Sequence, residues 1–189
     1  MPLRLLPPET TPDASVLVAT RGVRAFADGL VSVVLPSYLV LLGFDGLHVG
    51  AIVTGTLVGS AALTLAVGLR GHRLRRIRLL RMVALVMIAT GLGFGLLSAF
   101  WALLLVAVVG TLNPSAGDVS VFLPTEQALL PSTVSDAQRT ALYGRYSLVG
   151  FSVAAVGSLC AGLPHAIARH GVVTETQALR GVFLLYAAL

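Results

Sequence analysis

Charged residues are scarce in this sequence. Only 11% of its 189 residues are Asp, Glu, Lys or Arg, whereas soluble globular proteins carry about 25%. So few charges cannot cover a water-facing surface, and the hydrophobic fraction of 56% and mean hydropathy of +0.91 agree with this. The composition therefore excludes a soluble globular domain and predicts an integral membrane protein.

Cysteine is nearly absent as well. Cys160 is the single cysteine, which excludes an intrachain disulfide and a cysteine-rich metal site. The four histidines are scattered along the chain, and no HExxH, GxSxG, P-loop or glycine-rich dinucleotide motif is present. We therefore expect no enzyme, no cofactor and no metal. The net charge of +5 comes from arginines set between apolar runs, so no nucleic-acid partner is expected either.

Long apolar runs fill most of the chain. Residues 82–117 contain no charge, and as one helix they would be about 54 Å long, against a hydrocarbon core of about 30 Å. This stretch must therefore turn, and we expect the turn near Ser98 to Trp101. The expected fold is an all-α polytopic helical bundle with five complete transmembrane helices and the start of a sixth, at residues 25–44, 47–69, 79–97, 101–123, 140–163 and 181–189.

Residues 1–20 are expected to be a loosely held cytoplasmic tail, because several prolines interrupt any hydrophobic run there. Residues 21–189 then form the transmembrane bundle. With these spans, all but two of the thirteen arginines fall on one side of the membrane; the exceptions are Arg169 and Arg180. Because arginine accumulates on the cytoplasmic side, we expect a cytoplasmic N-terminus, in a bacterial-type plasma (inner) membrane.

The arginine-rich loop after the second run carries a recognisable pattern. It reads Gly68-Leu69-Arg70-Gly71-His72-Arg73-Leu74-Arg75-Arg76-Ile77. This resembles the G-x-x-x-D-R-x-G-R-[RK] motif of the major facilitator superfamily of transporters, with Gly68, Arg73 and Arg76 matching and His72 in the place of the acid. The first run, from Arg21 to Leu39, is similar to that superfamily's first helix. The fifth run lacks the glycine–proline signature of its proton-coupled drug antiporters.

The resemblance implies the N-terminal half of a secondary transporter, apparently truncated, whose partner is the missing C-terminal six-helix half. In that family the substrate site lies near the midplane between the halves. The acid of the loop motif helps to lock the cytoplasmic face there, a role in which His72 would act only as a hydrogen-bonding or weakly cationic group. We expect the chain alone not to transport.

Inserting an ionisable group within a membrane span costs about 2.5–3.5 kcal/mol on insertion scales, so each such residue is a candidate functional residue. Asp28 lies in the first run, four residues after Arg24. It is either a substrate- or proton-binding carboxylate that faces a cavity or an interfacial acid paired with Arg24. Asn113 and Pro114 interrupt the fourth run, where a kink or unwound turn would line a cavity.

A second group of charges is expected at the cytoplasmic boundary. Asp118 and Glu126 follow the fourth run, and Arg145 begins the fifth at the same level. The two acids are expected to neutralise Arg73, Arg76 or Arg145 and to hold the inward face together. The same cluster would be a gate if its pairs break and reform as the halves move.

The sequence thus predicts transport of a small solute by alternating access, driven by a gradient of a proton or another ion. Besides the solute and the coupling ion, its partner is the lipid bilayer. One alternative is a non-transporting membrane scaffold or assembly protein with the same bundle. Another is a membrane-embedded enzyme acting on lipids, for which only Asp118 and Glu126 come near the required cluster of acids.

Overall fold

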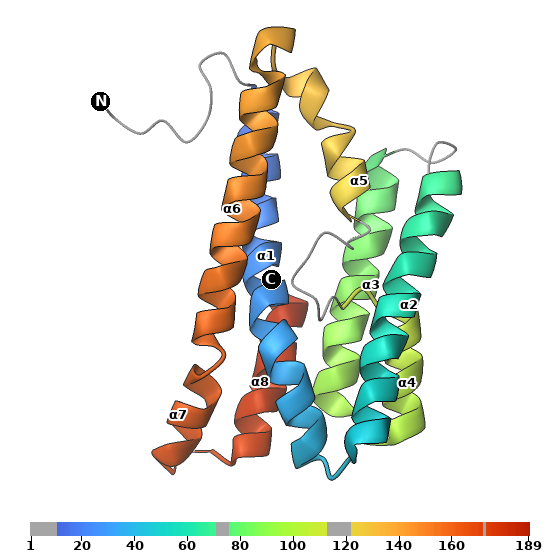
Figure 1. Cartoon of the computed structure of the whole chain (residues 1–189), viewed down its shortest axis with the longest axis vertical. Helices are drawn as coiled ribbons and strands as arrows, with labels where there is room; N and C mark the ends of the chain where they lie inside the picture. Colours follow the sequence, from blue (N-terminus) through green and yellow to red (C-terminus); the bar gives the residue numbers. More distant parts are fainter. Residues whose placement is uncertain (1–10, 71–75, 113–121, 172) are drawn as a thin grey trace.

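The computed structural model describes residues 11–70, 76–112, 122–171 and 173–189, and no strand occurs among them (Figure 1). The elements are, in order, α1 (Pro12–Leu41), α2 (Gly46–Arg70), α3 (Arg76–Leu96), α4 (Phe100–Val109), α5 (Phe122–Gln127), the 3-10 turns η2 (Leu130–Thr133) and η3 (Asp136–Gln138), α6 (Arg139–Cys160), α7 (Leu163–Arg169) and α8 (Glu175–Ala188). The all-α class expected from the sequence is confirmed.

Within these described ranges, four segments are long and apolar enough to cross a membrane. They are α1, α2, the part of α3 from Arg78 to Leu96, and the stretch from Asp136 to Arg169 that contains α6 and α7. The long helices lie roughly side by side (Figure 1). At one end α1 and α6 begin; we call it the N-terminal end. At the other end α1 connects to α2, α3 connects to α4, and α8 begins; we call it the α1–α2 end.

The helix α1 holds the bundle together. It packs most extensively on α6 and also on α8, while α3 packs on α8 and α2 packs on α4. Aromatic side chains fill the centre of the core. Tyr38 of α1 is fully buried, donates a hydrogen bond to the Phe94 carbonyl oxygen of α3 at 2.9 Å, and lies 4.9 Å from Phe183 of α8, ring centre to ring centre.

The α1–α6 contact depends on two glycines that let the backbones touch. A Cβ atom on Gly29 would lie 2.0 Å from the carbonyl oxygen of Ala154, and one on Gly157 would lie 2.2 Å from that of Phe26. Across this contact, Ser158 donates a hydrogen bond to the Gly29 carbonyl oxygen at 3.0 Å. Small residues at such positions allow the close helix packing on which membrane bundles depend.

Three expected boundaries are wrong. First, α1 begins at Pro12, so the last part of the expected tail is helical, and Ala14 packs against Leu130 and Leu142. Proline at the first helical position and Asp13 in the first turn both favour a helix start there. Arg21 and Arg24 therefore lie inside α1, not at its beginning.

Second, the fourth expected span, 101–123, is not one helix. The helix α4 ends at Val109, ten residues after it begins, because Gly110 adopts an extended conformation. The expected break at Asn113 and Pro114 lies outside the described residues, and the helix has already ended before it. Among the described residues, four segments are long and apolar enough to span a membrane, where five complete spans were expected.

Third, the last helix begins at Glu175 and not at residue 181. Thr174 and Gln177 form a capping box, in which the Gln177 backbone N–H donates to the Thr174 hydroxyl and the Thr174 N–H donates to the Gln177 side chain. This reciprocal pair satisfies two backbone donors that a helix start leaves free. Part of the expected loop, from Leu163 to Arg169, is the short helix α7.

Candidate functional site

A buried ion pair joins α1 to α5. Arg24 Nη1 lies 2.6 Å from Glu126 Oε1, and Arg24 Nη2 lies 2.6 Å from Glu126 Oε2. The side chain of Glu126 is 2% exposed and that of Arg24 is 11% exposed. Such a planar, two-point contact is the strongest arrangement available to an arginine and a carboxylate.

Two further side chains complete this polar cluster, which we define as Arg21, Arg24, Glu126 and Tyr146. The hydroxyl of Tyr146, on α6, donates a short hydrogen bond to Glu126 Oε2. The guanidinium of Arg21 lies 5.6 Å from the centre of the Tyr146 ring. The guanidinium of Arg24 lies 4.1 Å from the centre of the Phe122 ring. Cation–π contacts of this kind add to the ion pair where water is excluded.

Local sequence explains why the polar cluster forms. Arg21 and Arg24 are three residues apart on α1 and so share one face of the helix. Gly150 of α6 leaves the space that Arg21 needs, since a Cβ there would lie 2.6 Å from Arg21 Nε. Beside it, the hydroxyl of Tyr143 donates to the Gln127 carbonyl oxygen at 2.7 Å, which anchors the end of α5 on α6.

A second polar region lies where α4 stops. Ten helical residues span about 15 Å, half of a hydrocarbon core of about 30 Å. Side chains of three helices form hydrogen bonds with the backbone beyond α4. The hydroxyl of Thr90, on α3, accepts from the Thr111 N–H at 3.3 Å, and the hydroxyl of Tyr186, on α8, donates to the Thr111 carbonyl oxygen at 3.5 Å. The hydroxyl of Ser60, on α2, donates to the Leu112 carbonyl oxygen at 3.4 Å. Irregular backbone at this depth is tolerated only where protein or a water-filled cavity receives it.

Asp28 belongs to the same region. It lies on α1, half-buried, thirteen residues and therefore about 20 Å before the end of that helix at Leu41. Its carboxyl group interacts electrostatically with Arg24, Arg21 and the phenol of Tyr186. Across the part of the chain that the structure describes, the carboxyl has no hydrogen-bond or ion-pair partner. The ion pair of Arg24 goes to Glu126, so the expected Arg24–Asp28 pair is not formed.

The expected cytoplasmic cluster is corrected at Glu126. Its base is Arg24, where Arg73, Arg76 or Arg145 was expected, because the early start of α1 carries Arg24 to the depth of α5. Arg145 lies on α6, one residue before Tyr146. Gly68 lies near the end of α2 with open space around it. The remaining expected site residues lie outside the described part of the chain: His72, Arg73, the side chain of Arg76, Asn113, Pro114 and Asp118.

Several residues of these two sites were not singled out from the sequence. Arg21 was counted only as a topology signal, whereas Arg24 was also weighed as a partner of Asp28. Pro12 and Asp13, which mark the start of α1, are the signal that would have placed the two arginines within the helix. Nothing in the sequence pairs Tyr186 with the end of α4, since that contact joins residues 75 apart.

The apolar helices and the composition define the class: the chain is an all-α integral membrane protein. It is 28% identical over 177 residues to a yeast protein, the "Uncharacterized membrane protein YJR124C" of Saccharomyces cerevisiae. The alignment covers 93% of this chain and 40% of the yeast protein, so the chain spans less than half the length of that relative. No family model and no solved structure matches the chain.

Proposed function

We propose that the chain is the N-terminal half of a secondary transporter of the major facilitator type, which moves a small solute by alternating access. The observation that carries the proposal is Asp28. Its carboxyl group lies within a membrane-spanning helix and has no hydrogen-bond or ion-pair partner among the described residues, although Arg24 is one helical turn away. A charge in such a place is costly and is typically retained for an ion or a substrate.

The end of α4 supports the same function. An interrupted helix at mid-depth offers backbone groups to a solute or an ion, and discontinuous helices of this kind form the binding sites of many transporters. Tyr186 connects the two features, because it donates to the Thr111 carbonyl and interacts electrostatically with Asp28. Asp28 and the interrupted helix would then form one half of a solute site, and the missing C-terminal half would form the other.

In this proposal the polar cluster holds the cytoplasmic face together. The Arg24–Glu126 pair ties α5 to α1, and Tyr146 ties both to α6. With the N-terminus in the cytoplasm of a cell with a bacterial-type plasma membrane, this cluster would lie on the inner side of the solute site. The matching loop residues Gly68, Arg73 and Arg76 would lie at the same face.

The test is flux into vesicles that contain the full-length protein. A panel of labelled solutes is offered with and without an imposed proton gradient, and the wild type is compared with Asp28→Asn. We expect at least a tenfold loss of gradient-driven flux with normal membrane insertion, because the amide cannot carry a proton or pair with a cation. Asp13→Asn is the matched control, since Asp13 is an exposed acid in the first turn of the same helix.

Two outcomes contradict the proposal. Unchanged flux in Asp28→Asn would make Asp28 a structural residue of α1. Absence of movement for every solute, under every gradient, would favour the alternative of a membrane scaffold that uses the bundle only for protein contacts.

A further inference from the structure

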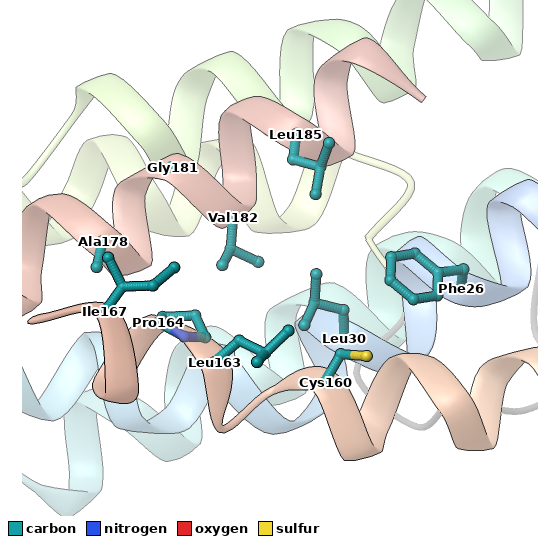
Figure 2. Close-up of a pocket in the computed structure, with 10 residues that line it drawn as sticks. All are labelled: Phe26, Leu30, Cys160, Leu163, Pro164, Ile167, Ala178, Gly181, Val182 and Leu185. Atoms are coloured by element: carbon teal, nitrogen blue, oxygen red, sulfur yellow. The ribbon is translucent and has the colours of Figure 1, made fainter.

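An apolar groove lies between α1, α8 and the α6–α7 break. It has a volume of about 330 Å³. Figure 2 shows its lining, in which Leu30, Leu163 and Val182 approach one another from three different elements. We define the groove by ten residues: Phe26, Leu30, Cys160, Leu163, Pro164, Ile167, Ala178, Gly181, Val182 and Leu185. None of these side chains is charged.

The groove exists because the chain breaks between α6 and α7. The helix α6 ends at Cys160, and α7 begins at Leu163 with Pro164 in its first turn. Proline cannot donate the backbone hydrogen bond that would continue α6. The chain therefore bends away at this point, and α7 packs on α8. A straight helix would leave a convex surface to the lipid, whereas this break leaves a hollow enclosed by three elements.

The groove lies within the depth of one leaflet of a bilayer. Along α8 its lining runs from Ala178 to Leu185, seven residues that rise about 10 Å. Its inner limit at Leu185 is about 15 Å from the start of α8 at Glu175, which is half of a hydrocarbon core of about 30 Å. A transmembrane helix, about 10–12 Å across with its side chains, is too wide for a hollow of this volume.

The charges at the mouth of the groove complement a phosphate. Arg169 and His170, both exposed, end α7 two and three residues beyond Ile167. Glu175, at the start of α8, is an acid at the same end of the bundle, and its carboxylate contacts the ring of His165 of α7. Arg180 is turned toward the core, where it donates to the Tyr38 hydroxyl at 3.4 Å. Arg169 is therefore the base that a lipid phosphate at the mouth would meet.

We propose that the groove binds one phospholipid, with an acyl chain along Leu30, Val182 and Ile167 and its phosphate beside Arg169. The lipid occupies the leaflet at the α1–α2 end of the bundle. It would hold α7 and α8 in place as a structural ligand, whatever the protein transports. The proposal is independent of Asp28 and of the solute site.

Two glycines provide a matched pair of variants. Gly181 lines the groove, and a Cβ there would meet no atom within 4 Å, so Gly181→Leu adds a side chain to the hollow from an open position. Gly144 of α6 has equally open surroundings but lies outside the groove. Leucine is a better helix former than glycine, so both variants keep their helices.

The experiment is native mass spectrometry of the full-length protein, stripped of lipid and titrated with phosphatidylglycerol. We expect one tightly bound lipid per wild-type chain, at least tenfold weaker binding by Gly181→Leu, and unchanged binding by Gly144→Leu. Arg169→Gln is expected to weaken binding about fivefold, the contribution of one base near a charged lipid surface. Circular dichroism checks that each variant is folded.

Cys160 gives an independent readout, since it is the single cysteine of the chain and lines the groove. Phosphatidylglycerol should slow its alkylation by a maleimide in the wild type and in Gly144→Leu but not in Gly181→Leu. Equal lipid binding by Gly181→Leu and the wild type would overturn the proposal. So would a wild type that carries no lipid and forms a dimer that Gly181→Leu abolishes, because the groove would then be an interface between two copies.

Discussion

Glu126 and Asp28 are both acids within the helical bundle, and they differ in burial and in bonding. Glu126 is almost fully buried, and it accepts two bonds from Arg24 and one from Tyr146. Asp28 is half-buried, with no such partner among the described residues, although the same arginine interacts with it electrostatically. Arg24 is bonded to the acid 102 residues away and not to the one four residues away.

From this contrast we expect Glu126 to be a structural acid and, under the proposed function, Asp28 to be a functional one. A saturated buried pair is hard to remove, because breaking it leaves one charge without compensation. A carboxyl within a span that has no hydrogen-bond or ion-pair partner among the described residues is kept at a cost, which its electrostatic interaction with Arg24 and Arg21 offsets only in part. We therefore expect substitution of Glu126 to reduce stability and substitution of Asp28 to reduce activity.

The largest expected effect is that of Glu126→Gln. It leaves the Arg24 guanidinium buried without its counter-charge, so the free energy of unfolding should fall by about 3–5 kcal/mol. Reversible denaturation in mixed micelles measures it. Glu175→Gln is the control, because the Glu175–His165 pair is partly exposed and its loss should cost about 0–1 kcal/mol. Equal losses in the two variants would remove the distinction between a buried and an exposed pair.

Tyr146→Phe should have the next largest effect. It deletes only the hydroxyl that donates to the Glu126 carboxylate, and a hydrogen bond to a charged group contributes about 1.5–3 kcal/mol. Tyr143→Phe is the matched control in the same helix, because its hydroxyl donates to a neutral carbonyl and should contribute about 0.5–1.5 kcal/mol. The same denaturation assay compares them, and a larger loss for Tyr143→Phe would contradict the charge-assisted bond.

Asp28→Asn should change stability in the opposite direction. Removal of an unpaired charge from a span is expected to raise the free energy of unfolding by about 0.5–2 kcal/mol, while flux is lost. The free energies of unfolding of Asp28→Asn and Glu126→Gln are measured in the same micelles, so that each variant serves as the control for the other. A loss of more than about 2 kcal/mol would show that Asp28 has a structural partner after all.

Asp45 should give the smallest effect, since its side chain is 68% exposed at the turn before α2. The His48 backbone N–H donates to it at 2.9 Å and the His48 ring lies 2.7 Å away, and these contacts lower the pKa of Asp45 below its ordinary 3.8. The stabilisation is therefore present above the pKa of the unfolded chain and is lost as the pH falls through the lower, folded value. Amide exchange in the first turn of α2 should quicken over that range.

Asp45→Asn tests the sign of this dependence. Asparagine keeps an oxygen that accepts from the helix start but does not titrate in acid. Its first-turn amide protection should therefore not respond to acidification in this range. A pH response that persists in Asp45→Asn would assign it to another group.

The bounds of three long helices could be predicted within three residues from hydropathy alone. The expected ranges 47–69, 79–97 and 140–163 correspond to α2, α3 and α6. Each is a predominantly apolar run, with at most one arginine, whose length matches the hydrocarbon core, so length and composition determine the helix. The turn between α3, which ends at Leu96, and α4, which begins at Phe100, is also close to the expected position near Ser98 to Trp101. A turn was required because the uncharged residues 82–117 are too long for one span.

The sites could be predicted only in part. Asp28 and Glu126 stand out because acids are rare in apolar runs, but their partners depend on where α1 begins and how α5 packs. The end of α4 depends on bonds from Ser60, Thr90 and Tyr186, which lie on three other helices. Such contacts join distant parts of the chain and leave no local pattern. The groove was not anticipated either, because it forms between elements and not within one.

The sequence separation of the Arg24–Glu126 pair has a consequence for biosynthesis. Synthesis runs at about 5–20 residues per second, so Glu126 is made roughly 5–20 s after Arg24, from which it is separated by 102 residues. During that interval α1 has reached the membrane with Arg21 and Arg24 unneutralised by α5 and α6. We therefore expect α1 to stay near the interface, with its arginines among lipid phosphates, until the segment that carries Glu126 has been made.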